Sequence, residues 1–497
     1  MERRAGVLLN VSSLPGKYGI GGFSCNAEYF LNEFAGLGFK IWQTLPITSV
    51  GCGYSPYSGI SSYAGNYLYI DMERLDGLLN RDELISSEYK GGIYLTDYEY
   101  AERVKGGLLK KAYSRVTDEI KEKIKLFVKE NKEWLCDYAV FKFLKTKYNN
   151  TCWTEWGEYS KHTQALVKKV IAENEYETGY YFFEQYYFFK QWNNIKEYAN
   201  GLGIKVFGDL PIYVSYDSVD VWANPDVFKL DKNYKPTEVA GVPPDYFAEE
   251  GQLWGNPLYN YEKMAKNNYK WWTDRMAHAY KLYDIVRIDH FRGLYEYWAV
   301  PADAETAKEG HWEKGPQLAL FEAIKKAVPD VEIIAEDLGL IDDNVRKFLE
   351  KTGYPGMRVL QFGFDGDKNN KHLPHNYVNH CVAYTATHDN DTTLGWLLSL
   401  DPSTLSDALN YVNCDVNYGW ANGAGNCRAT KACIRALMAS VADTVIIPMQ
   451  DLCGYGSDTR MNTPGQAFGC WTYRTNYQAL SDIDHGFIRN LIYIYGR

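Results

Sequence analysis

Clustered cysteines, basic stripes and long apolar runs are all missing from this sequence. The ten cysteines are scattered singly without a CxxC pair, which argues against a disulfide framework or zinc site and favours reduced thiols in the cytoplasm. With a net charge of −10 and no basic stripe, we expect no nucleic-acid partner. No apolar run approaches the ~20 residues of a membrane helix, so we expect no membrane partner.

Two common kinds of ligand site are also poorly supported. Gly19-Ile20-Gly21-Gly22 lacks the last glycine of the dinucleotide-binding motif GxGxxG. Three histidines lie close together, but their spacing fits no standard metal-ligand pattern, and a proline among them favours a loop. They are His372, His375 and His380. We therefore expect neither a metal nor a cofactor.

Eight short apolar runs recur along the chain, and most are separated by helical patterns. Val- and Ile-rich runs with little alternation are typical of strands buried on both faces, as in a parallel sheet. The runs are Val7–Val11, Ile41–Ile47, Lys205–Leu210, Asp284–Ile288, Val331–Ala335, Arg358–Phe364, Cys381–Thr385 and Thr444–Ile447. Eight such strands with helices between them predict an α/β fold, the (β/α)8 TIM barrel.

The uneven spacing of these runs predicts insertions within a single catalytic barrel domain, residues 1–497. Residues 71–195 carry charged helical patterns and an aromatic run, which predict a helical insertion subdomain between strands two and three. Residues 216–280 are rich in Pro, Gly, Asn and Trp, and the stretch Gly241–Gly255 within them reads as an exposed loop. Loops on the C-terminal face of a barrel often form a cleft wall and lid.

The stretch Asp284–Gly293 runs from a buried strand directly into charge. Arg287 and Asp289 point to the same side of that strand, because side chains alternate faces. A buried charge is costly unless paired, so we expect Arg287 to pair with Asp289 and to hold it ionised. Such a carboxylate suits a covalent nucleophile. A structural ion pair explains this segment equally well.

Acidic residues follow most of the predicted strands. They are Asp209, Asp289, Glu336, Asp337, Asp389, which follows His388, and Asp451. A single acid at a strand end is more often a helix N-cap, but so many in one register are hard to explain as caps. In a barrel these ends converge, and neighbouring carboxylates drive their pKa values apart, which allows one acid and one nucleophile. Two carboxylates flanking a glycosidic bond are the usual apparatus of glycoside cleavage.

Motifs spread over nearly the whole chain match one known family. They include Trp42–Pro46, Ser55–Tyr57, Gly208–Val214, Asp220–Pro225, Val286–Gly293, Ala335–Gly339, Thr387–Asp391 and Arg460–Asn462. In these motifs the chain resembles the 4-alpha-glucanotransferases (amylomaltases, or disproportionating enzymes) of glycoside hydrolase family 77. The resemblance implies a retaining enzyme that moves a segment of an alpha-1,4-glucan to the 4-hydroxyl of another glucan or of glucose.

The resemblance also implies roles for individual residues. Asp289 would be the nucleophile, Glu336 the general acid and base, and Asp389 the group that stabilises the transition state. The implied substrate-binding residues are Arg287, His388, Asp209, Tyr213, Tyr57, Gln252, Trp254 and Asn462. The chain departs from the family pattern at Glu249, Glu250 and Leu253, and at Cys470 and Tyr473, where the family tends to have Asn and Trp.

Two other functions fit the same residues. A hydrolase of the same clan would carry the same three acids, but the lid motif and the family-wide match argue against it. A catalytically silent glucan-binding protein would lack at least one of the three, and all are present. The expected partners are malto-oligosaccharides or other alpha-1,4-glucans, with glucose as an acceptor. The sequence does not distinguish starch, glycogen and maltodextrin as the source.

Overall fold

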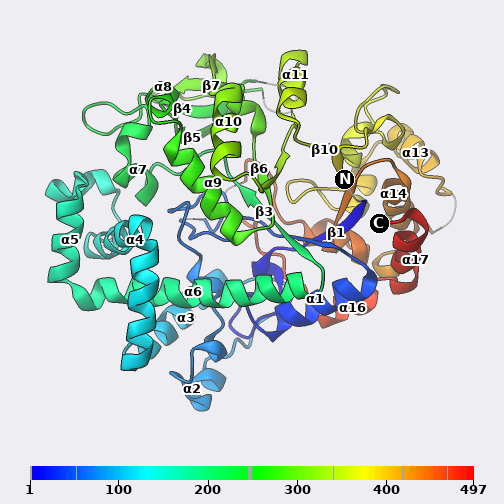
Figure 1. The fold of residues 1–497 in the computed structure, drawn as a ribbon. Coiled ribbons are helices and arrows are strands. Elements are labelled where there is room, and N and C mark those ends of the chain that lie inside the picture. The colour runs from blue at the N-terminus through cyan, green and yellow to red at the C-terminus, as the bar shows by residue number, and fades with distance from the viewer. Residues whose placement is uncertain (1–2, 52, 245–248, 340, 417–418, 467) are drawn as a thin grey trace.

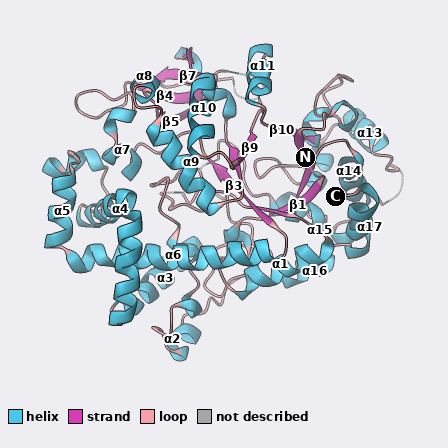
Figure 2. Ribbon diagram, in the orientation of Figure 1, coloured by secondary structure: helices cyan, strands magenta, loops and turns pink. Residues whose placement is uncertain are grey.

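The computed structural model describes residues 3–51, 53–244, 249–339, 341–416, 419–466 and 468–497. At its centre is an all-parallel sheet with the strand order β10-β11-β12-β1-β2-β3-β6-β9. These strands are β1 (Arg4–Leu8), β2 (Ile41–Gln43), β3 (Lys205–Leu210), β6 (Ile285–Ile288), β9 (Glu332–Ala335), β10 (Gly356–Val359), β11 (Cys381–Tyr384) and β12 (Thr444–Pro448). Figure 2 shows the strands in the interior and the helices around them.

The strands are short, apolar and buried along nearly their whole length. Burial on both faces is what a parallel barrel requires, because one face fills the interior and the other meets the helices. The predicted (β/α)8 barrel is confirmed, although the predicted ends of three strands were wrong by more than one residue. The first strand begins at Arg4, whose guanidinium bonds Glu332 of β9. Strands two and six end early, at Gln43 and Val359, and Leu360–Gly363 is a 3-10 turn.

The barrel closes between its first and last strands in the sheet order, β10 and β9. The backbone N–H of Ala335 donates to the carbonyl of Pro355 at 3.0 Å. Asp337, just after β9, accepts the Met357 N–H at 2.6 Å through Oδ1. Gly356 permits this approach, since a Cβ there would lie 2.7 Å from Asp337 Oδ1. A buried carboxylate thus joins the two edges of the sheet.

Helices cover the outside of the barrel between the strands. They are α1 (Cys25–Leu37), α9 (Lys270–Leu282), α10 (Gln317–Ala327), α11 (Asp343–Thr352), α12 (Thr393–Ser399), α13 (Pro402–Tyr411), α14 (Arg428–Ala439), α15 (Met449–Cys453), α16 (Tyr477–Asp482) and α17 (His485–Tyr495). Their ends follow local sequence rules. Asp342 caps α11 by accepting two N–H groups, and Gly353 ends it in the left-handed conformation.

A helical region separates β2 from β3. It contains α2 (Arg81–Ser86), α3 (Tyr98–Tyr113), α4 (Asp118–Lys147), α5 (Gln164–Glu173) and α6 (Glu175–Gly201). Figure 1 shows α6 running lengthwise beneath the barrel, with α4 and α5 to one side. The aromatic run of α6 is core, as predicted, because Phe183, Tyr187, Phe188 and Trp192 are fully buried.

A second, antiparallel sheet has the order β5-β4-β7-β8. Its strands are β4 (Glu238–Val242), β5 (Gln252–Pro257), β7 (Glu296–Pro301) and β8 (His311–Lys314); the short helices α7 (Val219–Ala223) and α8 (Tyr261–Ala265) lie nearby. The prediction of an exposed loop over Gly241–Gly255 was wrong for β4 and β5; its residues 245–248 lie outside the described residues. These strands were missed because β4 pairs with β7, which lies far along the chain, and such pairing leaves no local pattern in the sequence.

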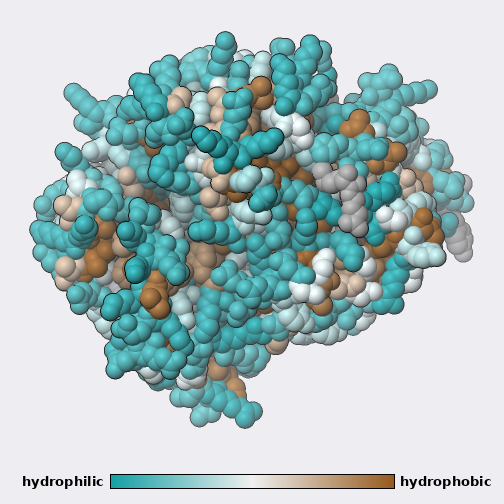
Figure 3. Space-filling view, viewed as in Figure 1, coloured by the Kyte–Doolittle hydropathy of each residue, from teal (hydrophilic) through white to brown (hydrophobic). Residues whose placement is uncertain are grey.

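The described residues were expected to lack membrane-spanning helices and disulfide bonds. None of the described helices has the length and apolar composition needed to cross a membrane. Every cysteine in the described segments is a free thiol. The face shown in Figure 3 is mainly hydrophilic, with small separate apolar patches.

Replacing Asp337 by Ala is expected to lower the free energy of unfolding by about 3 kcal/mol, because breaking a buried ion pair leaves its partners uncompensated. Asp337 is 3% exposed, and its Oδ2 lies 3.2 Å from Arg358 and 3.3 Å from Lys371. Urea unfolding followed by tryptophan fluorescence measures the change. The control is Glu122→Ala, which removes an exposed pair and should alter stability by less than about 0.5 kcal/mol. Equal effects of the two variants would contradict a closing role for Asp337.

Candidate active site

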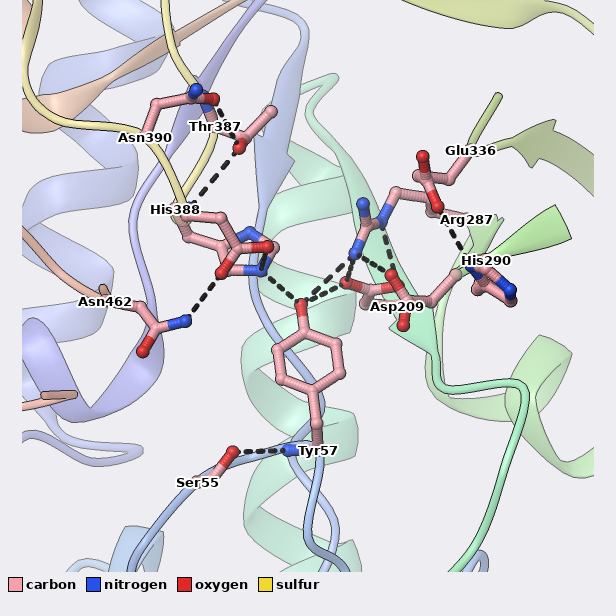
Figure 4. Close-up of polar contacts among 12 residues, drawn as sticks. Ser55, Tyr57, Asp209, Arg287, His290, Glu336, Thr387, His388, Asn390 and Asn462 are labelled. Carbon is pink, nitrogen blue, oxygen red and sulfur yellow. Dashed lines mark hydrogen bonds and ion pairs between the residues drawn. The ribbon is translucent and has the colours of Figure 1, made fainter. Parts of the chain in front are cut away.

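Charged and aromatic side chains meet at the C-terminal ends of the barrel strands (Figure 4). The buried centre is Arg287 on β6. Its Nε donates to Asp209 Oδ1 at 2.9 Å, and its Nη2 donates to Asp209 Oδ2 at 2.6 Å. The same Nη2 reaches Asp289 Oδ1 at 2.9 Å. Asp209 and Arg287 are register partners on adjacent parallel strands, so their side chains share a face.

The predicted pairing of Arg287 with Asp289 is therefore present, but Asp209 is the fuller partner. The side chains of Arg287 and Asp209 are 3% and 0% exposed, whereas that of Asp289 is 30% exposed. A buried guanidinium needs such a bidentate partner to offset its desolvation. Asp209 thus neutralises Arg287. Asp289 is bonded to Arg287 through Oδ1 alone, and its side chain is partly exposed.

Tyr57 connects this ion pair to His388. Its hydroxyl donates to Asp209 Oδ2 at 2.6 Å and accepts from Arg287 Nη2 at 3.2 Å. Because its single proton is used, the contact with His388 Nε2 at 2.8 Å requires that nitrogen to carry the hydrogen. The two rings stack 5.2 Å apart. Burial lowers the pKa of His388, so its ring is neutral at pH 7, with Nε2 also 3.3 Å from Asp389.

Asp389 lies on the loop after β11 and is held by neighbouring polar groups. Asn462 Nδ2 donates to its Oδ1 at 2.6 Å, and Arg460 Nη2 donates to its carbonyl at 2.8 Å. Its own N–H donates to Thr387 Oγ1 at 3.3 Å. The side chain is nevertheless 46% exposed. Asn462, which the resemblance suggested as a substrate contact, orients this carboxylate.

Glu336, directly after β9, is held by backbone amides. The His290 N–H donates to Oε2 at 2.7 Å, and the Leu338 N–H donates to Oε1 at 2.6 Å. His290 adopts a left-handed conformation with φ of 48°, which turns its amide toward the acid. Sequence reasoning did not assign His290 a role, because a backbone donor carries no residue-type signature.

Glu336 and Asp289 compete for a proton. Burial raises the pKa of Glu336 to about 7, although Arg287 and the two amides oppose the rise. Burial also raises the pKa of Asp289; Arg287 opposes this, and Asp209, Glu336 and Asp389 add to it. Arg287 therefore opposes the rise in the pKa of Asp289 without cancelling it, and its holding Asp289 ionised stays a prediction. One proton relieves both carboxyls, and the Arg287 hydrogen bond favours the proton on Glu336 and the charge on Asp289.

Aromatic side chains connect β5 to the acid. The Trp254 ring meets the His290 ring edge-on at 4.8 Å and lies 6.2 Å from Tyr213. Trp254 Nε1 donates to Gln252 Oε1 at 3.1 Å, and the Trp254 side chain remains partly exposed. Three of the predicted substrate-binding residues, Tyr213, Gln252 and Trp254, thus lie together beside the residue that holds Glu336.

Asp451 does not belong to the site, contrary to the strand-end expectation. It is 1% exposed and accepts bonds from the Thr385 hydroxyl and from the N–H and hydroxyl of Thr393, at the start of α12. Its carboxylate satisfies the first amide of α12, whose N-cap residue is Thr392. Asp337 likewise serves barrel closure. Spacing along the chain did not distinguish these two acids from the others, because side-chain direction depends on tertiary packing.

Comparison of the sequence with known proteins identifies a family. The family described as 4-alpha-glucanotransferase matches residues 9–480. This chain belongs to that family. A 4-alpha-glucanotransferase of Clostridium butyricum is 40% identical over 98% of this chain and 100% of its own length. One of Aquifex aeolicus is 41% identical over 100% of this chain and 99% of its own length.

A solved structure shows the same fold. The amylomaltase of Streptococcus agalactiae in complex with acarbose has a TM-score of 0.94 and 36% identity, over 100% of both chains. The barrel described above is therefore that of a 4-alpha-glucanotransferase. The chain is an enzyme that transfers segments of alpha-1,4-glucans.

The activity of this 4-alpha-glucanotransferase is expected to fall as the pH rises above about 7. Glu336 must carry a proton to act as an acid, and its raised pKa preserves that proton up to neutral pH, where an ordinary Glu has lost it. The measurement is kcat/KM for maltotriose against pH, with circular dichroism as the control for unfolding. A level kcat/KM from about pH 6 to 9 would contradict a Glu336 pKa near 7.

Proposed function

We propose that Asp289, Glu336 and Asp389 perform the transfer by a retaining double displacement. The observation that carries this proposal is the unequal environment of the two central carboxyls. Asp289 accepts a hydrogen bond from the buried Arg287 guanidinium. Within the described segments Glu336 has no cation bonded to it, and its pKa is raised to about 7. One group is thereby equipped as nucleophile and the other as acid.

In the first half of the reaction, the free oxygen of Asp289 attacks the anomeric carbon of the donor glucan. The bond from that carbon to the glycosidic oxygen breaks, and Glu336 gives its proton to the departing oxygen. A shorter glucan leaves, and the rest stays covalently joined to Asp289. Asp389, open to the site and steadied by Asn462, binds sugar hydroxyls and stabilises the positive charge that develops on the ring.

In the second half, the 4-hydroxyl of an acceptor sugar attacks the same carbon. Glu336, now ionised, takes the proton of that hydroxyl, and the Asp289 carboxylate leaves. Two inversions at one carbon give net retention. Transfer exceeds hydrolysis when an acceptor sugar occupies this position in place of water.

The remaining predicted residues divide into two groups. Arg287, Asp209, Tyr57 and His388 form one hydrogen-bonded set, which we assign to orienting Asp289 and binding the sugar at the reacting bond. Gln252 and Trp254 belong to the insertion 216–280, and Tyr213 lies just before it in the chain, with its ring 6.2 Å from that of Trp254. We propose this insertion as a wall and lid that exclude water. We treat residues 71–195 as a helical insertion subdomain of the same catalytic domain.

The proposed substrates are malto-oligosaccharides or longer alpha-1,4-glucans as donors, with a second glucan or glucose as acceptor. The names of the relatives and the acarbose complex of the Streptococcus agalactiae amylomaltase support this choice. The scattered free thiols and the lack of a membrane-spanning helix among the described residues support a cytoplasmic location.

Incubation with maltotriose alone is expected to yield glucose together with a ladder of longer oligosaccharides, because each transferred segment lengthens an acceptor. Separation of the products by size measures this outcome. A hydrolase would give only shorter sugars, and a silent binding protein would give none. The absence of any product longer than maltotriose would refute the transferase mechanism.

Asp289→Asn is expected to reduce turnover by at least about a thousandfold, because the amide cannot form the covalent intermediate. Maltotriose should still bind, which isothermal titration calorimetry can measure. The matched control is Asp226→Asn, which alters a carboxylate that is 92% exposed and should leave turnover unchanged. Substantial activity in Asp289→Asn would mean that another group is the nucleophile.

A further inference from the structure

The segment 460–471, here called the 460–471 loop, contacts the site through the side chains of Arg460, Asn462 and Trp471; residue 467 lies outside the described part. Asn462 donates to Asp389 Oδ1 at 2.6 Å. The Trp471 ring lies 5.8 Å from the Tyr57 ring and 6.0 Å from the His388 ring, measured between centroids. The loop therefore touches both the proposed transition-state stabiliser and the sugar-binding pair.

Two contacts join the beginning of the 460–471 loop to its end. The Trp471 N–H donates to the Met461 carbonyl at 2.7 Å. The Thr463 N–H donates to Cys470 Sγ at 3.4 Å, and the same sulfur lies 3.9 Å from the Thr463 carbonyl, to which its S–H can donate. These contacts fix the backbone on either side of Asn462.

Cys470 also precedes a strained residue. Trp471 has a φ of 65°, a left-handed conformation that a bulky side chain adopts only when its surroundings hold it there. Its carbonyl accepts the Tyr98 hydroxyl at 2.8 Å, and its side chain is 6% exposed. The Cys470 thiol is thus bonded to Thr463, which follows Asn462, the partner of Asp389. In the sequence Cys470 precedes Trp471, which packs beside Tyr57 and His388.

We propose that Cys470 is a positioning residue for the transfer reaction. Its thiol closes the 460–471 loop and thereby sets Asn462 against Asp389 and Trp471 against the Tyr57–His388 pair. This role rests on the proposed function of Asp389. It also explains how the chain tolerates a cysteine where the family pattern has Asn, since an Asn side-chain oxygen could accept the same Thr463 N–H.

Loss of the thiol leaves the Thr463 N–H without its acceptor and loosens the backbone around Asn462. Asp389 keeps its place on the barrel but loses its fixed orientation. An interaction that matters mainly in the transition state affects kcat more than KM when it is weakened. The expected signature of the Cys470 role is therefore a kcat defect in a correctly folded enzyme.

Cys470→Ala is expected to lower kcat for maltotriose by about tenfold, with KM changed by less than about twofold and an unchanged thermal midpoint. Cys470→Asn should recover most of the lost kcat. The matched control is Cys152→Ala, which removes another partly buried thiol that accepts a hydrogen bond, from the Thr154 hydroxyl at 3.4 Å. That variant should retain the wild-type kcat.

A double-mutant cycle tests whether Cys470 acts through Asn462. In an Asn462→Ala background, Cys470→Ala should cause less than about half of its usual loss on a logarithmic scale. An unchanged kcat in Cys470→Ala, failed recovery by Asn, or losses that simply multiply would each overturn the proposal. Asp389→Asn, assayed in parallel, keeps the questions separate: full activity there would refute the proposed function itself.

Discussion

The site depends on the bidentate ion pair between Arg287 and Asp209. The pair joins β3 to β6 in the interior of the barrel, where an unpaired guanidinium could not be buried. Once neutralised by Asp209, Arg287 still has a donor for Asp289 and another for the Tyr57 hydroxyl. Through Tyr57 the same charge determines the tautomer of His388. Asp289, the proposed nucleophile, and the proposed sugar-binding residues Tyr57 and His388 are therefore oriented by one buried cation.

The acid is controlled differently. Glu336 accepts hydrogen bonds from two backbone N–H groups, and burial raises its pKa to about 7 despite the nearby guanidinium. Asp289 and Glu336 cannot both be ionised without strong repulsion, so the proton on one supports the charge on the other. The 460–471 loop adds a third element, because Asn462 holds the exposed Asp389. Hydrogen bonds to backbone and amide groups thus complement the central ion pair.

Much of this arrangement could be predicted from the sequence, and the failures have physical causes. Val- and Ile-rich runs revealed the eight strands, since burial on both faces leaves a continuous apolar signal. The strand β5 was missed because it is an exposed edge strand, and Gly251 and Gly255 on either side of Leu253 and Trp254 indicate a loop. Asp451 was grouped with the site acids, yet its side chain turns to Thr393 and accepts that residue's N–H and hydroxyl.

The sequence by itself determined the barrel, the three carboxylates and the family, because these depend on residue type, periodicity and motif spacing. Only the tertiary structure decided that Asp209 is the main partner of Arg287, that His290 and Leu338 hold Glu336 by their amides, and that a thiol closes the 460–471 loop. Backbone donors and cross-strand partners leave no mark in the sequence. Their effect arises from distance and direction, which exist only after the chain has folded.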